Sequence, residues 1–195
     1  MPTNILLSGV GGQGIITASK VLAEAALISG FHVKKSEVHG MSQRGGSVES
    51  HVRFSADGRV HSPLIPVGQT DILLAFELLE ALRSIPTTAP EALVLVDDRR
   101  IVPMSVTSGP FEYPAAPLDQ LAASGRRVHV VSSLTVANDL GEPRAANIVM
   151  LGAASRFLPI EPQAWTEAIR RAVRPKAVEL NLRAFQEGID TLRVE

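Results

Sequence analysis

A glycine-rich turn near the start of the chain limits the fold more than any other feature of the sequence. Residues 4–10 form a short apolar run, and residues 15–29 form a long segment rich in alanine, leucine and isoleucine. Between them, Gly9, Gly11 and Gly14 match the pattern G-x-G-x-x-G. The pattern therefore predicts a strand, a tight glycine turn and a helix whose N-terminus suits a phosphate or another anion.

The segments that follow predict a mixed sheet. Residues 32–38 form a second predicted strand, so the opening is typical of a βαβ unit with parallel strands. Residues 47–54 alternate between apolar and polar side chains, which indicates a strand with one buried face. Asp57-Gly58 follows directly, and it predicts a hairpin in which residues 60–65 return beside that strand.

The rest of the chain continues the alternation of strands and helices. Nearly continuous apolar runs predict buried strands, and prolines at helix starts predict a helical last third. We expect a single three-layer α/β/α Rossmann-like domain over residues 1–195, with a mixed, mostly parallel sheet. The predicted elements are strands at 70–76, 92–96 and 127–131, helices at 77–85 and 145–157, a surface connection at 103–117, and helices that begin at Pro162 and Pro175.

Composition excludes several classes of function. Nineteen Lys and Arg residues against twenty Asp and Glu residues give a formal net charge of -1, so no global field attracts nucleic acid or an anionic membrane. The chain has no cysteine, so it cannot supply thiolate ligands to zinc or to an iron–sulfur cluster. The N-terminus does not look like a signal peptide, and the apolar stretches are too short or too interrupted to span a bilayer. We expect a cytoplasmic protein.

The glycine turn alone leaves its ligand open. In dinucleotide-binding folds an acidic residue about 20 positions further on binds the ribose. Glu37, at the end of the second predicted strand, could take that role in an NAD- or FAD-binding oxidoreductase. Alternatively, Gly9, Gly11 and Gly14 could only allow a strand and a helix to pack closely, or could bind another phosphate-bearing cofactor or a partner's side chain.

A second polar loop, between two predicted strands, has a less common composition than the glycine turn. Residues 36–47 include one histidine, an arginine and three glycines. Ligands of open α/β sheets bind beyond the carboxyl ends of strands, so we expect this loop to lie beside residues 11–14. Arg44 could bind a phosphate or a carboxylate, or could be a solvated cation. His39 is interpreted as a polar loop residue, and His51 as a solvated or interface residue on the polar face of its strand.

Both loops together resemble the gamma-type domain of the 2-oxoacid:ferredoxin oxidoreductases, and most of all the small (beta) subunit of the indolepyruvate type. The segments that carry the resemblance are residues 9–14 (GVGGQG) and 36–48 (SEVHGMSQRGGSV). Further matches run through most of the chain in the order and spacing of the family. They are residues 62–65, 71–77, Asn147, 150–153, Asn181-Leu182, Ala184-Phe185 and Gly188.

The resemblance implies a subunit of an enzyme complex, with the isolated chain inactive. A large (alpha) partner subunit would carry thiamine diphosphate, magnesium and [4Fe-4S] clusters. That partner would decarboxylate the 2-oxoacid and pass electrons to ferredoxin, while coenzyme A takes the acyl group. The present chain would hold no cofactor alone and would contribute to a shared crevice for coenzyme A. The sequence agrees, because it has neither cysteines nor the G-D-G motif of a thiamine–magnesium site.

The resemblance also implies which residues line that crevice. Gly11, Gly12, Gln13 and Gly14 would form a backbone cradle, with one amide contact from Gln13. The opposing lip would consist of Arg44, Gly45 and Gly46, with Arg44 on a phosphate or on an interface carboxylate. Gly9, Ser42 and Gln43 are further candidates for cofactor binding. Glu37 would then anchor a loop or an interface rather than a ribose. No catalytic residue and no metal ligand is assigned to this chain, and a non-catalytic nucleotide-binding regulator stays a third alternative.

Overall fold

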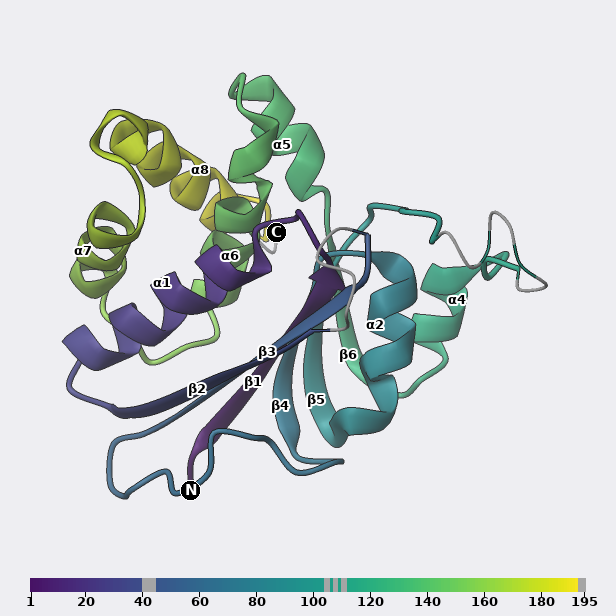
Figure 1. Ribbon diagram of the computed structural model, residues 1–195, viewed down its shortest axis with the longest axis horizontal. Coiled ribbons are helices and arrows are strands. Elements are labelled where there is room, and N and C mark those ends of the chain that lie inside the picture. Colours follow the sequence, from purple (N-terminus) through teal and green to yellow (C-terminus); the bar gives the residue numbers. More distant parts are fainter. Residues whose placement is uncertain (40–44, 104–105, 107–108, 110–111, 193–195) are drawn as a thin grey trace.

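The computed structural model describes residues 1–39, 45–103, 106, 109 and 112–192 and shows one six-stranded sheet between two layers of helices (Figure 1). The strand order is β2-β3-β1-β4-β5-β6. This architecture confirms the predicted three-layer α/β/α fold. The strands are β1 (Thr3–Val10), β2 (His32–His39), β3 (Ser47–Ser55), β4 (Thr70–Ala75), β5 (Thr88–Asp97) and β6 (Arg127–Val131).

The sheet is mixed and mostly parallel, as predicted. Strands β1, β4, β5 and β6 pair in parallel, whereas β3 pairs antiparallel with both β1 and β2. Strands β1 and β2 therefore point the same way, but β3 lies between them. The two strands of the opening βαβ unit are therefore parallel, as predicted, but they are not neighbours in the sheet.

The predicted hairpin at Asp57-Gly58 is wrong. Residues 60–65 form no strand, because β3 already has a hydrogen-bonded neighbour on each side. They run along β3 as a loop instead: Arg53 Nη1 donates to the carbonyls of Ser62 and Leu64, both at 2.9 Å. The hairpin that does form joins β2 to β3, with His39 opposite Val48 in register.

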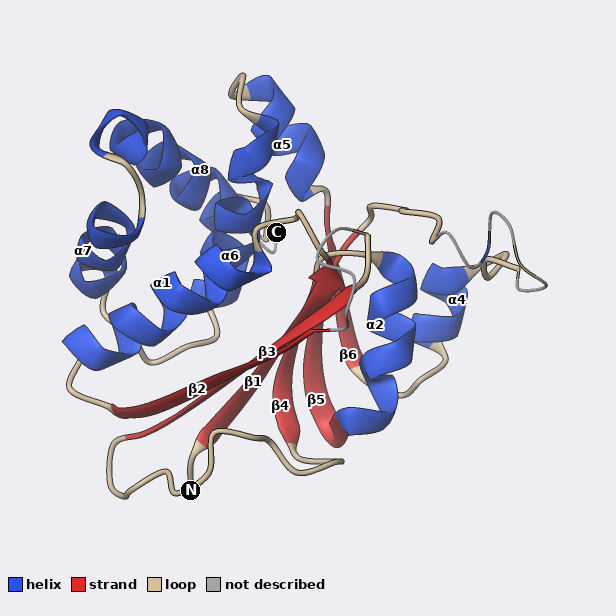
Figure 2. Ribbon diagram, viewed as in Figure 1, coloured by secondary structure: helices blue, strands red, loops and turns tan. Residues whose placement is uncertain are grey.

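Helices cover both faces of the sheet (Figure 2). On one face lie α1 (Ile15–Ile28), α6 (Ala146–Ser155), α7 (Pro162–Ala172) and α8 (Val178–Asp190), and on the other lie α2 (Leu78–Ser84) and α4 (Pro117–Ala122). Helix α7 begins at Pro162 as predicted. A 3₁₀ turn at Pro175–Ala177 precedes α8, and the short helices α4 and α5 (Ser133–Asp139) were not predicted.

The apolar core follows these layers. The larger cluster lies between the sheet and the layer of α1, α6, α7 and α8, and it includes Trp165 and Phe185, whose ring centroids are 5.3 Å apart. The smaller cluster lies under α2 and α4 around Leu121. Strands β4 and β5 are buried on both faces, since they contribute to both clusters, as their continuous apolar runs predict.

Two glycines allow α6 and α8 to cross at very short range. A Cβ atom on Gly152 would lie 2.0 Å from the carbonyl oxygen of Phe185, and one on Gly188 would lie 2.0 Å from that of Val149. The helices therefore meet backbone to backbone, which fixes α8 and its Asn181 relative to the start of α6. Within the described part of the chain, no helix has the length and apolar character needed to cross a membrane.

Candidate functional site

The glycine loop between β1 and α1 is closed by the side chain of Gln13. Its Oε1 accepts a hydrogen bond from the Val10 amide at 2.7 Å, and its Nε2 donates to the carbonyl of Phe76 at 2.5 Å. Gly9 leaves room for this arrangement, because a Cβ there would lie 2.7 Å from Gln13 Oε1. The carboxamide of Gln13 thus ties the loop to the end of β4.

The last glycine of the pattern allows α6 to approach the start of α1. Gly14 has φ +80°, and a Cβ there would lie 2.5 Å from Nδ2 of Asn147. The same Nδ2 donates to the carbonyl of Gly14 at 3.0 Å. Gly12 differs, since its φ is +106° and no described atom lies within 4 Å of a Cβ built there. Close packing therefore accounts for Gly9 and Gly14, and Gly12 faces open space.

The described end of the second polar loop, at Gly45 and Gly46, lies beside the glycine loop, as predicted. The amide of Gly11 donates to the carbonyl of Gly46 at 2.8 Å, and the amide of Gly45 donates to the carbonyl of Gly11 at 3.4 Å. Ser47, at the start of β3, donates from Oγ to Glu80 Oε2 at 2.5 Å. The candidate residues Ser42, Gln43 and Arg44 lie outside the described residues, so their roles stay predictions.

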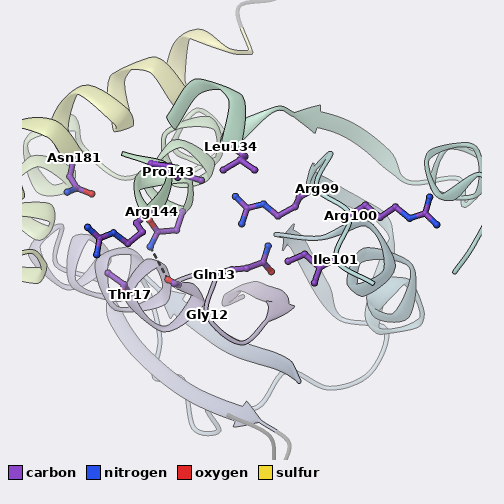
Figure 3. Close-up of a pocket in the computed structure, with 13 residues that line it drawn as sticks. Gly12, Gln13, Thr17, Arg99, Arg100, Ile101, Leu134, Pro143, Arg144 and Asn181 are labelled. Carbon is purple, nitrogen blue, oxygen red and sulfur yellow. Dashed lines mark hydrogen bonds between the residues drawn. The ribbon is translucent and has the colours of Figure 1, made fainter. Parts of the chain in front are cut away.

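A cavity of about 630 Å³ opens on the other side of the glycine loop (Figure 3). Gly45 and Gly46, which were predicted to form the opposing lip, do not line this cavity. Its walls come from the start of α1, the segment after β5, the starts of α5 and α6, and α8. The lining residues are Gly12, Gln13, Gly14, Thr17, Arg99, Arg100, Ile101, Leu134, Pro143, Arg144, Ala146, Asn147 and Asn181.

Three arginines line this cavity, and they differ in their contacts. Arg144 has a side chain that is 89% exposed and that hydrogen-bonds to Glu142 through Nε at 2.8 Å and Nη2 at 3.0 Å. Arg100 stacks over the ring of Tyr113 at 4.2 Å from the centroid. Arg99 has a side chain that is only 18% exposed, and its Nε lies 3.8 Å from Oδ2 of Asp97. In Figure 3, Arg99 and Arg100 point in opposite directions.

Buried Asp97 lies behind Arg99 at the carboxyl end of β5. Its carboxylate accepts hydrogen bonds from Oγ of Ser133 at 2.6 Å and from the amide of Ser133 at 3.3 Å. Burial raises the pKa of Asp97 to about 6, although the hydrogen bond from Ser133 and the charge of Arg99 oppose that rise. The Asp97–Ser133 contact therefore joins β5 to the start of α5, beside the cavity.

Buried Glu77 holds the segment that carries Arg99 and Arg100. Its Oε1 accepts from the amide of Ile101 at 3.0 Å and from the hydroxyl of Tyr113. The neighbouring amide of Leu78 donates to the carbonyl of Arg99 at 3.1 Å. Burial, followed by the hydrogen bond to Glu77, raises the pKa of the Tyr113 hydroxyl. The arginine segment is therefore fixed on both sides of its backbone.

Glu37 does not lie where a dinucleotide-binding fold needs its acidic residue. It forms an ion pair with Lys35 on β2, and β3 separates β2 from β1. Neighbouring strands are about 4.8 Å apart, so β2 is roughly 10 Å from the strand that leads into the glycine loop. The insertion of β3 removes the direct neighbourhood of the second strand and the glycine turn on which ribose binding depends.

Of the two roles expected for His51, solvated or interface, the solvated one is wrong, because its side chain is only 13% exposed, and the interface role stays a prediction. Its Nδ1 accepts from the amide of Ile65 at 3.3 Å, and its Nε2 lies 3.9 Å from Oε2 of Glu49. Burial, followed by the charge of Arg53, lowers the pKa of His51. Its role is to hold the loop that runs along β3.

A second cavity of about 550 Å³ shares Arg144 and Asn181 with the first. Arg174 and Lys176 add positive charge to its wall. Across the residues that the structure describes, no group of three or more His, Cys, Asp or Glu side chains is placed to hold a metal ion. Together the described walls of the two cavities carry four arginines and Lys176 against one acidic side chain, Glu142, and we call the two cavities the cationic groove. The glycine loop lies at one end of it.

Sequence reasoning missed Arg99, Arg100 and Arg144. A usable signal existed for the first two, because they directly follow a buried parallel strand, and ligands of open α/β sheets bind beyond such ends. Arg144 carried no such signal. Its place at the cavity depends on the packing of the C-terminal helices.

Comparison with known proteins gives consistent matches over nearly the whole chain. The family model described as pyruvate ferredoxin/flavodoxin oxidoreductase matches residues 4–191. The indolepyruvate oxidoreductase subunit IorB of Archaeoglobus fulgidus is 41% identical over 194 residues, which cover 96% of this chain and 94% of that protein. The corresponding subunit of Thermococcus kodakarensis is 39% identical over 193 residues, covering 95% of this chain and 94% of that protein.

Solved structures share the fold. The gamma subunit of a keto/oxoacid ferredoxin oxidoreductase from Geobacter sulfurreducens has a TM-score of 0.72 and 29% identity, and the match covers 97% of each chain. A 2-oxoglutarate:ferredoxin oxidoreductase from Magnetococcus marinus, solved with 2-oxoglutarate, coenzyme A and succinyl-CoA bound, has a TM-score of 0.74 and 20% identity. That match covers 97% of this chain and 31% of the other, and at this identity it shows the fold alone.

Proposed function

The chain belongs to the pyruvate ferredoxin/flavodoxin oxidoreductase family, and from this membership we propose that it is the small subunit of an indolepyruvate-type 2-oxoacid:ferredoxin oxidoreductase. The complex would convert a 2-oxoacid, coenzyme A and oxidised ferredoxin to carbon dioxide, acyl-coenzyme A and reduced ferredoxin. Support for the indolepyruvate type comes from relatives of that name that are about as long as this chain and about 40% identical to it.

We propose that this chain contributes the cationic groove to the binding of coenzyme A. The observation that carries this part is the cavity in which the start of α1, the open face of Gly12 and three arginines meet. Helix N-termini and guanidinium groups both favour phosphate oxygens. Coenzyme A offers such oxygens at its diphosphate and at its 3′-phosphate, so its chemistry fits the residues present.

The redox and thiamine chemistry would belong to the partner subunit. Without cysteine this chain cannot ligate an iron–sulfur cluster through thiolates, so the clusters, thiamine diphosphate and magnesium are proposed to lie on the large subunit. Bound thiamine diphosphate supplies the decarboxylation of the 2-oxoacid. The described residues of this chain would bind and orient coenzyme A. We propose a cytoplasmic complex.

The geometry does not favour an NAD- or FAD-dependent oxidoreductase. That alternative needs Glu37 beside the glycine loop, but Glu37 lies on the edge strand, pairs with Lys35 and is separated from β1 by β3. Two of the three glycines of the pattern can be explained without a dinucleotide, since Gly9 accommodates Gln13 and Gly14 accommodates Asn147.

Anaerobic affinity purification of the tagged chain from its own host tests the proposal. We expect a large subunit in equal amount, the absorbance of iron–sulfur clusters and bound thiamine diphosphate. The purified complex should reduce ferredoxin with indolepyruvate only when coenzyme A is present. A colourless chain that elutes alone, binds NAD and loses that binding in Glu37→Ala would contradict the proposal and support the dinucleotide alternative.

A further inference from the structure

We propose that Arg99 is the residue of this chain that binds a phosphate group of coenzyme A, through the side edge of its guanidinium formed by Nε and Nη2. The inference rests on the proposed function, and it goes further by naming one receptor among the arginines of the groove. Arg99 is the candidate for this contact among the residues that the structure describes, and Arg44, which lies outside them, stays a separate prediction.

The side edge of Arg99 lacks an acceptor among the described residues, and its two nitrogen atoms have almost no exposed surface, so a ligand contacts them only after the side chain turns toward the cavity. Both Nε and Nη2 are buried, and neither has a hydrogen-bond partner in the described part of the chain. The nearest carboxylate oxygen, Oδ2 of Asp97, is 3.8 Å from Nε, which is too long for a hydrogen bond. These two N–H groups are the pair with which arginine binds an oxyanion side-on. A buried charged donor without an acceptor is unfavourable, so an oxyanion at this edge would remove the penalty.

The carboxylate behind Arg99 forms a long ion pair with it, at 3.8 Å, but accepts its hydrogen bonds from another residue. Asp97 accepts two hydrogen bonds from Ser133, at 2.6 and 3.3 Å, and these hold it toward α5 rather than toward the guanidinium. Asp97 therefore provides a nearby negative charge that stabilises the arginine in a buried place without filling its donor edge. The arrangement leaves the binding capacity of Arg99 for a group that is not part of the described chain.

The other two arginines of the cavity are less suited to this role. Arg144 already forms a two-point contact with Glu142 and is almost fully exposed, so a ligand would have to compete with an existing pair and with water. Arg100 stacks on Tyr113 and points away from Arg99. Among these three, the side edge of Arg99 is both buried and without a hydrogen-bond partner.

The backbone of Arg99 is held in place. Its carbonyl accepts from the amide of Leu78 at 3.1 Å, and two residues later the amide of Ile101 donates to Glu77. A fixed backbone reduces the entropy lost when the side chain binds a ligand. On the same cavity, Gly12 leaves open space near the start of α1, where further phosphate oxygens can approach backbone N–H groups. A diphosphate, with several oxygens, fits this pair of donors better than a single carboxylate does.

The test uses the purified complex of both subunits with an Arg99→Gln substitution. Glutamine removes the charge and the two-point edge but keeps a polar side chain of similar reach. We expect the KM for coenzyme A to rise roughly 10- to 100-fold, with a smaller change in kcat and no change in the KM for the 2-oxoacid. Calorimetric binding of desulfo-coenzyme A to the complex should weaken by the same factor, which gives a readout independent of turnover.

Three further variants sharpen the result. Arg99→Lys keeps the charge but cannot bind side-on, so it should restore only part of the affinity. Arg171→Gln is a matched control, because this exposed arginine on α7 pairs with Glu24 and Glu167 away from the cavity, and its affinity for desulfo-coenzyme A should equal that of the wild type. The third variant, Arg144→Gln, should weaken that affinity less than Arg99→Gln does. Subunit stoichiometry and melting temperature, measured for each variant, verify that the complex is intact.

Each contrary outcome has a separate meaning. Unchanged binding in an intact Arg99→Gln complex, with a large loss in Arg144→Gln, overturns the assignment to Arg99 and leaves the proposed function standing. A raised KM for the 2-oxoacid alone also overturns it, because the oxyanion at Arg99 would then be the substrate carboxylate. A wild-type complex that binds no desulfo-coenzyme A and does not need coenzyme A for turnover overturns both the inference and the proposed function.

Discussion

Replacing Gly152 with alanine should destabilise the protein strongly, because α6 and α8 touch through their backbones at this point. The new Cβ would lie 2.0 Å from the carbonyl oxygen of Phe185 and 3.0 Å from Cα of Gly188, whereas ordinary contact begins at 3.4 Å. The helices would have to separate by roughly 1.4 Å at the crossing. A gap of about 0.5–1 Å already removes a quarter to a half of each dispersion contact.

The size of the effect follows from what this separation disturbs. Phe185 of α8 is buried against Trp165 in the larger core cluster, so moving α8 loosens that packing as well. Overpacked cores typically lose about 1–3 kcal/mol, and a clash with a helix backbone belongs at the upper end of that range. At about 2–4 °C per kcal/mol for a chain of this length, we expect the melting temperature to fall by about 6–12 °C.

Thermal unfolding followed by circular dichroism measures this difference, and Gly58→Ala is the matched control. A Cβ on Gly58 has only Ser55 Oγ nearby, at 3.9 Å, and its φ is not in the left-handed region. The control should melt within about 1–2 °C of the wild type or slightly higher. If Gly152→Ala melted as high as Gly58→Ala, the close crossing would not be a property of the folded protein and the reasoning would be refuted.

Three further substitutions test the contacts around the cavity. Gly14→Ala should lower the free energy of unfolding by about 2 kcal/mol or more in urea titrations, because it combines a left-handed φ with a clash against Asn147, and adding Asn147→Ala should recover only the part due to the clash. Asp97→Asn should remove a pH dependence of the free energy of unfolding. Because the pKa of Asp97 is raised from 3.8 to about 6 in the folded state, the free energy of unfolding of the wild type falls by up to about 3 kcal/mol as pH rises from about 4 to 6. If the difference between the two proteins stayed constant across that window, the raised pKa would be contradicted. Tyr113→Phe should lower the free energy of unfolding by about 1–2 kcal/mol at neutral pH, since it leaves the buried carboxylate of Glu77 one donor short, and an unchanged urea midpoint would count against that contact.

The strands were predictable because the pattern of apolar residues within each strand reflects which of its faces are buried. Strands β4 and β5 have continuous apolar runs and contribute to both core clusters, and β3 buries every second residue from Val48 to Phe54, while the residues between them are only partly buried. Strand order was not predictable in the same way, since pairing depends on partners far away in the chain. The turn signal at Asp57-Gly58 was read as a hairpin, but β1 and β2 already occupied both edges of β3.

The glycine loop was predicted to border a ligand site and a cavity does lie beside it, but the sequence analysis did not connect the three arginines of that cavity. In the sequence, Arg99 and Arg100 stand in a short polar segment, and Arg144 stands about 45 residues later, so nothing local connects them. They line one cavity because the segment after β5 and the start of α6 both lie at the same edge of the sheet, close to the glycine loop. Such a cluster is a consequence of topology, which a pattern of neighbouring residues does not contain.

The position of β3 decides which ligand chemistry the glycine pattern can serve. In a dinucleotide-binding sheet the second strand lies beside the first, and its acidic end faces the glycine turn. Here β3 fills that place, and its neighbouring loop hydrogen-bonds directly to Gly11. The open side of the turn is therefore the side of β5 and α6, where the charged side chains that line the cavity, among the described residues, are arginines. Both a dinucleotide and coenzyme A would bring a diphosphate to such a turn, but only the dinucleotide site also needs an acid for its ribose hydroxyls, and β3 takes the place from which that acid would come.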